Sequence, residues 1–321
     1  MGQQTFSVLE KKAVLASYQK VTIIGAGAIG ISWAALFLAN GLNVTVNDPR
    51  PDLEDATLKD IQEISPSLKA LGYDIKGLRK NLSFEKDLNN AVKDADLIQE
   101  NGPENVPFKQ DLYVQIESNL KPTALVLSSS SGIPSTIITE KMKDAGRVLI
   151  GHPFNPPHLI PLVEVVPGTR TSKEALAAAI QFYTSIGKTP IVIEKETPGF
   201  VANRLQAALM KESTYLVSTG VVSMENLDRI VSSSIGLRWA AAGPFKTFTL
   251  GGGPGGLPHF LKHLGPGLEQ LWSVLGNPHL DQPTNDLLIE QVNNSYAKTP
   301  YQELAKERDE QQLSIMKALS K

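Results

Sequence analysis

The sequence contains no cysteine among its 321 residues. This absence excludes disulfide bonds, thiolate metal sites and thiol nucleophiles together. The chain also lacks an uninterrupted apolar stretch long enough to span a membrane, and its N-terminal region carries Glu10, Lys11 and Lys12 where a signal peptide would have an apolar core. We therefore expect a soluble, cytoplasmic protein that does not bind membranes.

An excess of charge of one sign is also missing. The formal net charge is −2, the isoelectric point is about 6.2, and the sequence has neither a basic cluster nor an interleaved aromatic stripe. Nucleic acid is therefore not an expected partner, and small molecules are. The length and the 41% hydrophobic content suffice for two domains with ordinary cores, so no structural metal is predicted.

A glycine-rich segment, Gly-Ala-Gly-Ala-Ile-Gly at 25–30, follows the β-branched run 21–24 and opens a helical pattern. This is the G-x-G-x-x-G motif in its required setting, with a strand before it and a helix after it. The first glycine permits a tight turn, the second lets the backbone approach a diphosphate, and the third lets the helix pack on the strand. The expected cofactor contacts here are Gly25, Gly27, Ala28, Ile29 and Gly30.

The carboxylate of Asp48 follows a second predicted strand, 41–46. A carboxylate at this place accepts hydrogen bonds from the adenosine ribose and repels a 2′-phosphate, which favours NAD over NADP. Arg50 is the alternative signal, because a nearby guanidinium can reverse that preference.

Strand and helix patterns alternate through the first two thirds of the chain, which predicts an α/β fold with a Rossmann-type, doubly wound parallel sheet. We predict a cofactor domain over 1–196 and an all-α C-terminal domain over 197–321, with a helix starting near Pro198. The segment Gly251–Gly256 is too glycine-rich for regular structure and is either a lid or a turn. Further strands are expected at 94–98, 123–128, 148–150, 162–166 and 190–193, and further helices at 106–120, 223–230, 257–275, 283–295 and 300–319.

His152 precedes two prolines, and Glu164 lies in an apolar run typical of a buried strand. Pro156 and Pro157 forbid helix between them, so the chain should turn and return as a strand that brings the imidazole and the carboxylate face to face. A buried carboxylate requires such a partner. The pair is either structural, closing a loop, or catalytic.

The chain resembles the L-3-hydroxyacyl-CoA dehydrogenase family over nearly its whole length. The resemblance rests on the following segments: 25–30, Glu104-Asn105, 128–132, Gly151 to Asn155, Glu164 and Pro198 to Arg204. It implies hydride transfer between NAD and C3 of a 3-hydroxy acid derivative. His152 would accept the hydroxyl proton, and Glu164 would orient the imidazole and stabilise its protonated form.

The same resemblance assigns four further residues. Ser131 and Asn203 would hydrogen-bond the substrate oxygen or orient His152, with Ser130 as an alternative to Ser131. Glu104 and Lys109 would lie near the nicotinamide ribose. Without the resemblance, the serines are a polar turn after a strand, and the other three residues are ordinary solvated side chains.

Within the family the chain resembles the branch that acts on L-carnitine and L-gulonate more than the acyl-CoA enzymes. The segments 152–164, 236–239 and 243–245 carry this likeness, and 259–268 and 303–309 favour L-carnitine. Arg238 would bind the substrate carboxylate, since a guanidinium pairs with it in a bidentate manner, unless it is a surface arginine paired with an acidic neighbour. Trp239 and Phe248 would contact the trimethylammonium group through cation-π interactions, unless they are simply core residues.

Three alternatives remain open from the sequence. L-gulonate could be the substrate, the protein could bind NAD without turnover, as in the crystallin of this branch, or it could be an acyl-CoA dehydrogenase that prefers CoA esters to free acids. A homodimer is expected through the helical C-terminal domain, because the family forms dimers in that way, and Arg238 could then act across subunits.

Overall fold

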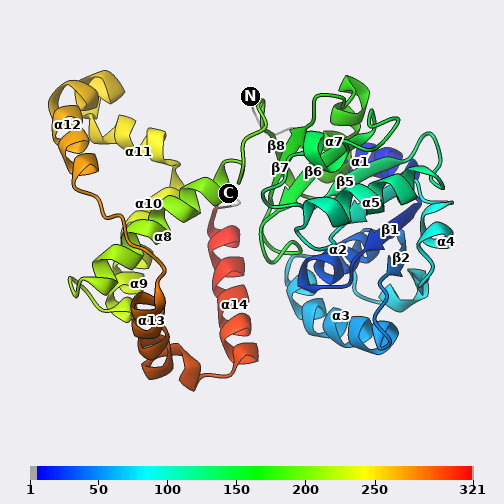
Figure 1. Ribbon diagram of the computed structural model, residues 1–321, viewed down its shortest axis with the longest axis horizontal. Coiled ribbons are helices and arrows are strands. Elements are labelled where there is room, and N and C mark those ends of the chain that lie inside the picture. The colour runs from blue at the N-terminus through cyan, green and yellow to red at the C-terminus, as the bar shows by residue number, and fades with distance from the viewer. Residues whose placement is uncertain (1–5, 320–321) are drawn as a thin grey trace. The chain divides into compact units, whose positions relative to one another are not determined.

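The computed structural model describes residues 6–319 and divides into two compact units, one through Asn203 and one from Arg204. The described strands all belong to the first unit, drawn in blue to green in Figure 1, whereas the regular elements in the described part of the second unit are all helices. The division follows Asn203, whereas the sequence analysis placed it after residue 196. A turn that follows the last strand packs against the sheet unit, which accounts for the later position.

The sheet has eight strands in the order β3-β2-β1-β4-β5-β6-β7-β8. Neighbouring strands are parallel, except that β7 runs antiparallel to β6. The predicted doubly wound α/β fold is therefore confirmed, with the two strands β7 and β8 running antiparallel to the other six. The bounds are β1 Lys20–Ile24, β2 Asn43–Asn47, β3 Leu82–Phe84, β4 Leu97–Glu100, β5 Leu125–Ser128, β6 Val148–Pro153, β7 Leu162–Pro167 and β8 Thr189–Val192.

Helices cover both faces of this sheet because successive strand residues point to opposite sides. In β4, Leu97 packs into one buried core with α2, α3 and α7, and Ile98 packs into the other with α4, α5 and α6. The helices are α1 Val8–Ala16, α2 Ala28–Ala39, α3 Leu53–Ala70, α4 Leu88–Val92, α5 Val106–Glu117, α6 Ser135–Ile138 and α7 Lys173–Ser185, and η1 Leu78–Asn81 is a short 3-10 helix. The short strand β3 was missed by the sequence analysis.

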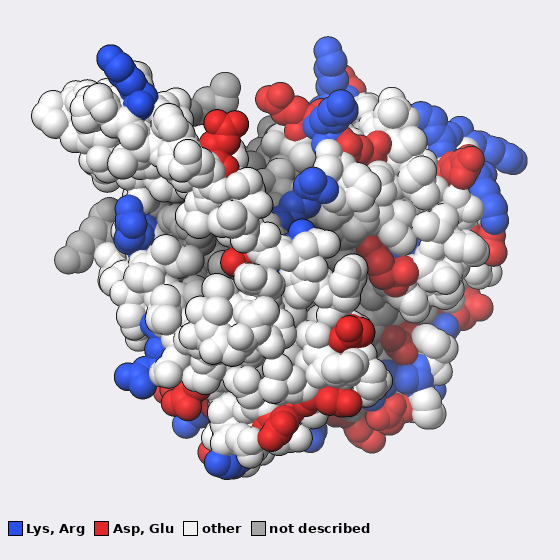
Figure 2. Space-filling model, turned by 60° about the vertical axis from the view of Figure 1, so that its left-hand side comes forward, with Lys and Arg blue, Asp and Glu red and all other residues white. Residues whose placement is uncertain are grey.

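The second unit exposes much of its apolar surface. Helices α10, α12 and α13 bury no residue, and Phe245, Trp272 and Leu237 are each more than half exposed. On the face shown in Figure 2, acidic and basic side chains are interspersed and uncharged residues cover broad areas between them. The elements are α8 Ala202–Ser218, α9 Met224–Ser233, α10 Ile235–Ala241, α11 Pro244–Gly251, η2 Gly253–Gly255, α12 Gly256–Ser273, α13 Gln282–Asn294, η3 Tyr296–Lys298 and α14 Tyr301–Leu319.

The glycine-rich segment Gly251–Gly256 was wrongly predicted to lack regular structure. It ends α11, forms the 3-10 helix η2 and begins α12, with positive φ at Gly253 and Gly256. Glycine tolerates these angles, so the chain can reverse between two helices without leaving helical hydrogen bonding for long. Among the described residues, no helix is both long enough and apolar enough to cross a membrane.

Candidate active site

The candidate site lies at one edge of the sheet. Strands β1, β4, β5 and β6 are mutually parallel, so their carboxyl ends meet at the same edge. The residues within one position of these ends are Gly25, Glu100, Ser128 and His152. In open α/β sheets, ligands bind at this edge beside a reversal of strand order, here between β1 and β4.

The glycine loop after β1 fits a dinucleotide diphosphate. Gly25 has φ of 89°, which L side chains rarely adopt, and a Cβ built on Gly30 would lie 1.9 Å from the carbonyl oxygen of Gly25. Only glycine therefore allows the turn and the close packing of α2. A Cβ built on Gly27 meets nothing within 4 Å, so this side of the loop is open at the N-terminus of α2, where backbone N–H groups and the helix dipole favour an anion.

Asp48 lies directly after β2, beside this loop. Its carboxylate accepts hydrogen bonds from the backbone N–H groups of Ala26, at 2.8 Å, and Arg50, at 3.0 Å. The guanidinium of Arg50 instead forms two 2.9 Å hydrogen bonds with Asp52. The arginine is thus paired with a carboxylate of its own, which supports NAD over a 2′-phosphorylated cofactor.

His152 and Glu164 face each other across the antiparallel pair β6–β7. They are register partners, and Nδ1 of His152 lies 2.9 Å from Oε2 of Glu164. Both side chains are buried, and the rings of Phe154 and Phe200 lie against the imidazole. The predicted face-to-face pairing is confirmed, and it leaves Nε2 of His152 as the ring nitrogen away from the carboxylate.

The second oxygen of Glu164 is held by the turn at 198–201 and the start of α8. Its Oε1 accepts hydrogen bonds from the N–H groups of Val201, at 3.0 Å, and Ala202, at 2.9 Å. Burial by itself raises the pKa of Glu164, but the hydrogen bonds from His152 and from these two N–H groups outweigh it and bring the pKa below its ordinary value. The carboxylate is therefore ionised at neutral pH.

The same turn explains why α8 begins at Ala202 and not near Pro198 as the sequence suggested. Gly199 and Phe200 both have positive φ, 74° and 49°. Such an angle is strained for a phenylalanine, and strain of this kind persists only where the surrounding structure holds it. Here the buried Phe200 packs beside His152, and the turn that follows it binds Glu164.

Ser131 and Asn203 are brought together beside the dyad's supporting turn. The side-chain amide of Asn203 donates to the backbone oxygen of Ser131 at 3.1 Å. Ser131 is exposed, whereas Ser130 is buried and its hydroxyl donates to Glu104 at 2.7 Å. Of the two serines, Ser131 is therefore the one available to a substrate.

Lys109 is buried and is therefore not the ordinary solvated side chain that it would be without the family resemblance. Its side chain is only 1% exposed, and its ammonium donates to both carboxylate oxygens of Glu100, at 2.7 and 2.9 Å. Oε2 of Glu104, whose side chain is 39% exposed, lies 3.9 Å from the same ammonium. The ammonium of Lys109 is therefore not itself exposed at the sheet edge, and the exposed group that it contacts there is the carboxylate of Glu104.

Sequence reasoning missed Glu100, which is fully buried at the end of β4. Its carboxylate also accepts hydrogen bonds from the N–H of Gly102, at 2.6 Å, and from the hydroxyls of Ser128, at 2.6 Å, and Tyr113, at 3.2 Å. The sequence does contain a signal for it. Glu100 is an acidic residue at the end of a strand, at the same edge of the sheet where the glycine motif and the serine run follow their own strands.

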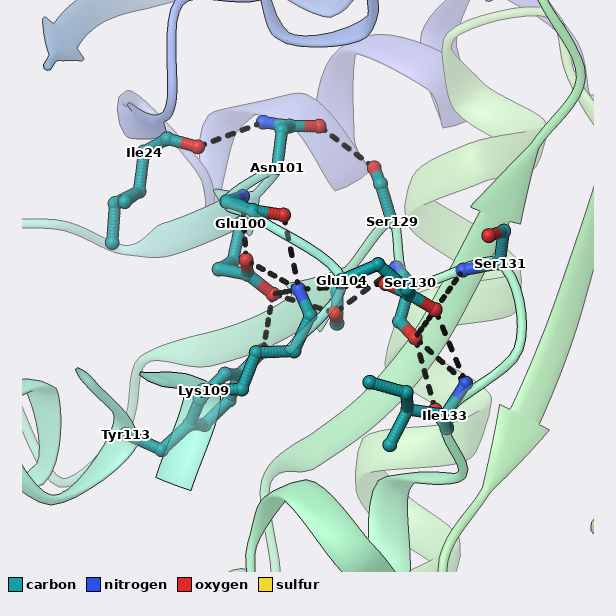
Figure 3. Close-up of polar contacts among 12 residues, drawn as sticks. Ile24, Glu100, Asn101, Glu104, Lys109, Tyr113, Ser129, Ser130, Ser131 and Ile133 are labelled. Carbon is teal, nitrogen blue, oxygen red and sulfur yellow. Dashed lines mark hydrogen bonds and ion pairs between the residues drawn. The ribbon is translucent and has the colours of Figure 1, made fainter. Parts of the chain in front are cut away.

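A second missed group joins the glycine loop to the serines. The hydroxyl of Ser129 donates to Oδ1 of Asn101 at 2.7 Å, and the amide of Asn101 donates to the carbonyl oxygen of Ile24 at 3.2 Å. Figure 3 shows this chain of contacts beside the buried Glu100 cluster. The indole N–H of Trp33, on α2, also donates to Ser129, at 3.1 Å.

The three substrate-binding candidates lie in the helical unit. Arg238 and Trp239 are on α10, and Phe248 is on α11, where its ring lies 4.9 Å from that of Phe260. Trp239 is 40% exposed, so it is not simply a core residue of this chain. The dyad and the cofactor-binding candidates belong to the first unit.

Two family models match consecutive parts of the chain. Residues 20–197 match the NAD binding domain of 3-hydroxyacyl-CoA dehydrogenase, and residues 199–281 match its C-terminal domain. The first match spans the sheet and identifies NAD as the cofactor of the glycine loop.

Relatives extend over almost the full length. A 3-hydroxyacyl-CoA dehydrogenase of Gibberella moniliformis is 43% identical over 94% of this chain and 95% of its own. An L-carnitine dehydrogenase of Streptomyces coelicolor is 39% identical over 94% of both chains. Among solved structures, 5-formyl-3-hydroxy-2-methylpyridine 4-carboxylic acid 5-dehydrogenase, described as an NAD⁺-dependent dismutase, matches with a TM-score of 0.75 and 29% identity over 94% of this chain and 98% of that one.

Proposed function

Because the chain belongs to the 3-hydroxyacyl-CoA dehydrogenase family and is an NAD-dependent oxidoreductase, we propose that it oxidises the 3-hydroxyl of a small free 3-hydroxy carboxylic acid, with L-carnitine as the preferred substrate. The observation that carries the catalytic part is the 2.9 Å contact between His152 and Glu164 at the sheet edge that holds the glycine loop. Because His152 and Glu164 are the residue types that general-base catalysis needs, the pair argues for an enzyme and against an NAD-binding protein without turnover.

The chemistry follows from what each side chain can do. NAD, when bound, supplies the acceptor for the hydrogen and electron pair that leave C3. Nε2 of His152 takes the hydroxyl proton as a general base, a role worth about 10²- to 10⁴-fold in rate. Glu164 holds the Nδ1–H tautomer and stabilises the imidazolium that forms. Ser131 and Asn203 hydrogen-bond the substrate oxygen and orient it toward His152.

The preference for a free acid rests on the relatives and on the helical unit. The L-carnitine dehydrogenase relative and the pyridine carboxylic acid dehydrogenase are named for substrates without CoA. Arg238 supplies a guanidinium for a carboxylate, and Trp239 and Phe248 supply aromatic faces for a quaternary ammonium group, which has no hydrogen-bond donor. L-gulonate would instead need several polar partners.

A second candidate substrate is a 3-hydroxyacyl-CoA, because the relative that is 43% identical carries that name. The test is NADH formation with NAD and, in parallel, L-carnitine, L-gulonate, 3-hydroxybutyrate and 3-hydroxybutyryl-CoA. We expect kcat/KM to be highest for L-carnitine, by about 5- to 30-fold over 3-hydroxybutyrate, because loss of one cation-π group costs on the order of 1–2 kcal/mol. A higher kcat/KM for the CoA ester than for every free acid would contradict the proposal.

We also propose that the protein is a homodimer through its helical unit. Exposed large apolar side chains are concentrated there, among them Leu237, Phe245 and Trp272, and isolated chains rarely leave so much apolar surface uncovered. Sedimentation equilibrium should give twice the 34.7 kDa mass of one chain. A mass equal to one chain at micromolar concentration would contradict the dimer.

A further inference from the structure

The carboxylate of Glu104 is enclosed by one loop, which we call the serine loop, residues 130–133. Its Oε1 accepts hydrogen bonds from the Ser130 hydroxyl at 2.7 Å and from three successive N–H groups, those of Ser131 at 3.0 Å, Gly132 at 2.8 Å and Ile133 at 3.2 Å. Figure 3 shows the donors converging on this oxygen. Successive N–H groups of this kind form an anion-binding nest, here occupied by the chain's own side chain.

The other side of the same carboxylate faces a fixed cation. Oε2 of Glu104 lies 3.9 Å from the ammonium of Lys109, which Glu100 holds in place by two hydrogen bonds. Because Lys109 is buried, its charge is weakly screened and fixes the direction of the Glu104 side chain. Glu104 therefore connects a rigid buried pair to a surface loop.

The serine loop in turn touches the segment that orients the dyad. A Cβ built on Gly132 would lie 3.9 Å from the nitrogen of Gly199, and the Asn203 amide donates to the backbone oxygen of Ser131. The turn that contains Gly199 is followed by the two N–H groups that bind Oε1 of Glu164. A shift of the serine loop would therefore displace both Ser131 and the support of Glu164.

We propose that Glu104 is a positioning residue, whose carboxylate fixes the serine loop and thereby sets Ser131 and Asn203 against the His152–Glu164 dyad. This role differs from the cofactor contact that the family resemblance implies for Glu104. This inference deepens the proposed function. The expected effect of Glu104 on the rate rests on that function, whereas the expected effect of Glu104 on the serine loop does not.

The test compares Glu104→Ala, Glu104→Gln and wild-type protein in three measurements: amide hydrogen exchange, NADH affinity by fluorescence titration, and kcat. In Glu104→Ala the amides of Ser131 and Gly132 lose their acceptor, so their exchange should be at least about tenfold faster. kcat should fall roughly 10²-fold, since small misplacements of reacting groups cost that much, while the Kd for NADH changes less than about threefold. Glu104→Gln keeps one acceptor oxygen and should retain most of the exchange protection.

Glu117 provides a matched control. Its carboxylate accepts hydrogen bonds from the backbone N–H groups of Lys143, at 3.0 Å, and Asp144, at 2.6 Å, away from the candidate site. Glu117→Ala should speed exchange at those two amides and leave kcat and the Kd for NADH unchanged.

Two results would overturn the proposal. Exchange at Ser131 and Gly132 that stays at the wild-type rate in Glu104→Ala would show that Glu104 does not hold the loop. A Kd for NADH that rises at least tenfold, with kcat restored at saturating cofactor, would show that Glu104 acts through the cofactor. If no 3-hydroxy acid is turned over by the wild-type protein, the proposed function fails, and the exchange measurement still decides the role of Glu104 in the loop.

Discussion

Replacing His152 with glutamine should lower kcat by about 10²- to 10⁴-fold, the contribution of a positioned general base. Glutamine is similar in size and can hydrogen-bond Glu164, but it cannot take a proton at neutral pH. The glycine loop and Asp48 are untouched by the change, so the Kd for NADH should stay within about threefold of the wild-type value. Steady-state kinetics and a fluorescence titration measure the two quantities.

The control for this change is His279→Gln, because His279 is an exposed histidine of the helical unit and is not among the candidate site residues. It should leave kcat and the Kd for NADH unaltered. Wild-type turnover in His152→Gln would show that the pair with Glu164 is structural, which is the other role that the sequence left open.

Replacing Lys109 with methionine should cost about 3–5 kcal/mol in the free energy of unfolding, because it leaves Glu100 charged and unpaired in the interior. Glu100 is fully buried, so water cannot replace the lost ammonium. Urea denaturation followed by circular dichroism measures the loss as a lower midpoint. The double variant Glu100→Gln/Lys109→Met removes both charges and should recover most of it, since a neutral pair of similar volume avoids the uncompensated charge.

Lys141→Met is the matched control for this second prediction. Lys141 pairs with Asp111 at 2.6 Å, but both side chains are about half exposed or more. Exposed pairs contribute at most about 1 kcal/mol, so this variant should be close to wild type. If Lys109→Met is as stable as Lys141→Met, the buried pair of Lys109 and Glu100 at the end of β4 does not stabilise the fold.

Some features of the site could be predicted because they depend only on residues that are close together in the sequence. The turn at Gly25 needs positive φ and the helix behind it needs a small residue at Gly30, so the spacing of glycines is sufficient evidence. The pairing of His152 with Glu164 was also predictable, since the prolines between them leave only an extended return. That return proved to be the antiparallel strand β7, which places the two residues in register.

The contacts that depend on distant segments could not be predicted in this way. Nothing near Lys109 in the sequence indicates that it is buried on Glu100, because this follows from α5 packing over the end of β4. The positive φ of Phe200 likewise depends on the burial of its ring beside His152, and moves the start of α8 to Ala202. In the helical unit, the periodicity of apolar residues predicts the helices, but it does not predict what covers their apolar faces.

The measurement that tests the central claim most directly is transfer of deuterium from C3 of L-carnitine to NAD, followed by mass spectrometry of the NADH. Direct hydride transfer at the His152–Glu164 site predicts one deuterium in NADH for each 3-keto acid formed, while the hydroxyl proton exchanges with solvent through His152. NADH that forms without deuterium, or C3-deuterated L-carnitine that yields no NADH at all, would contradict this account.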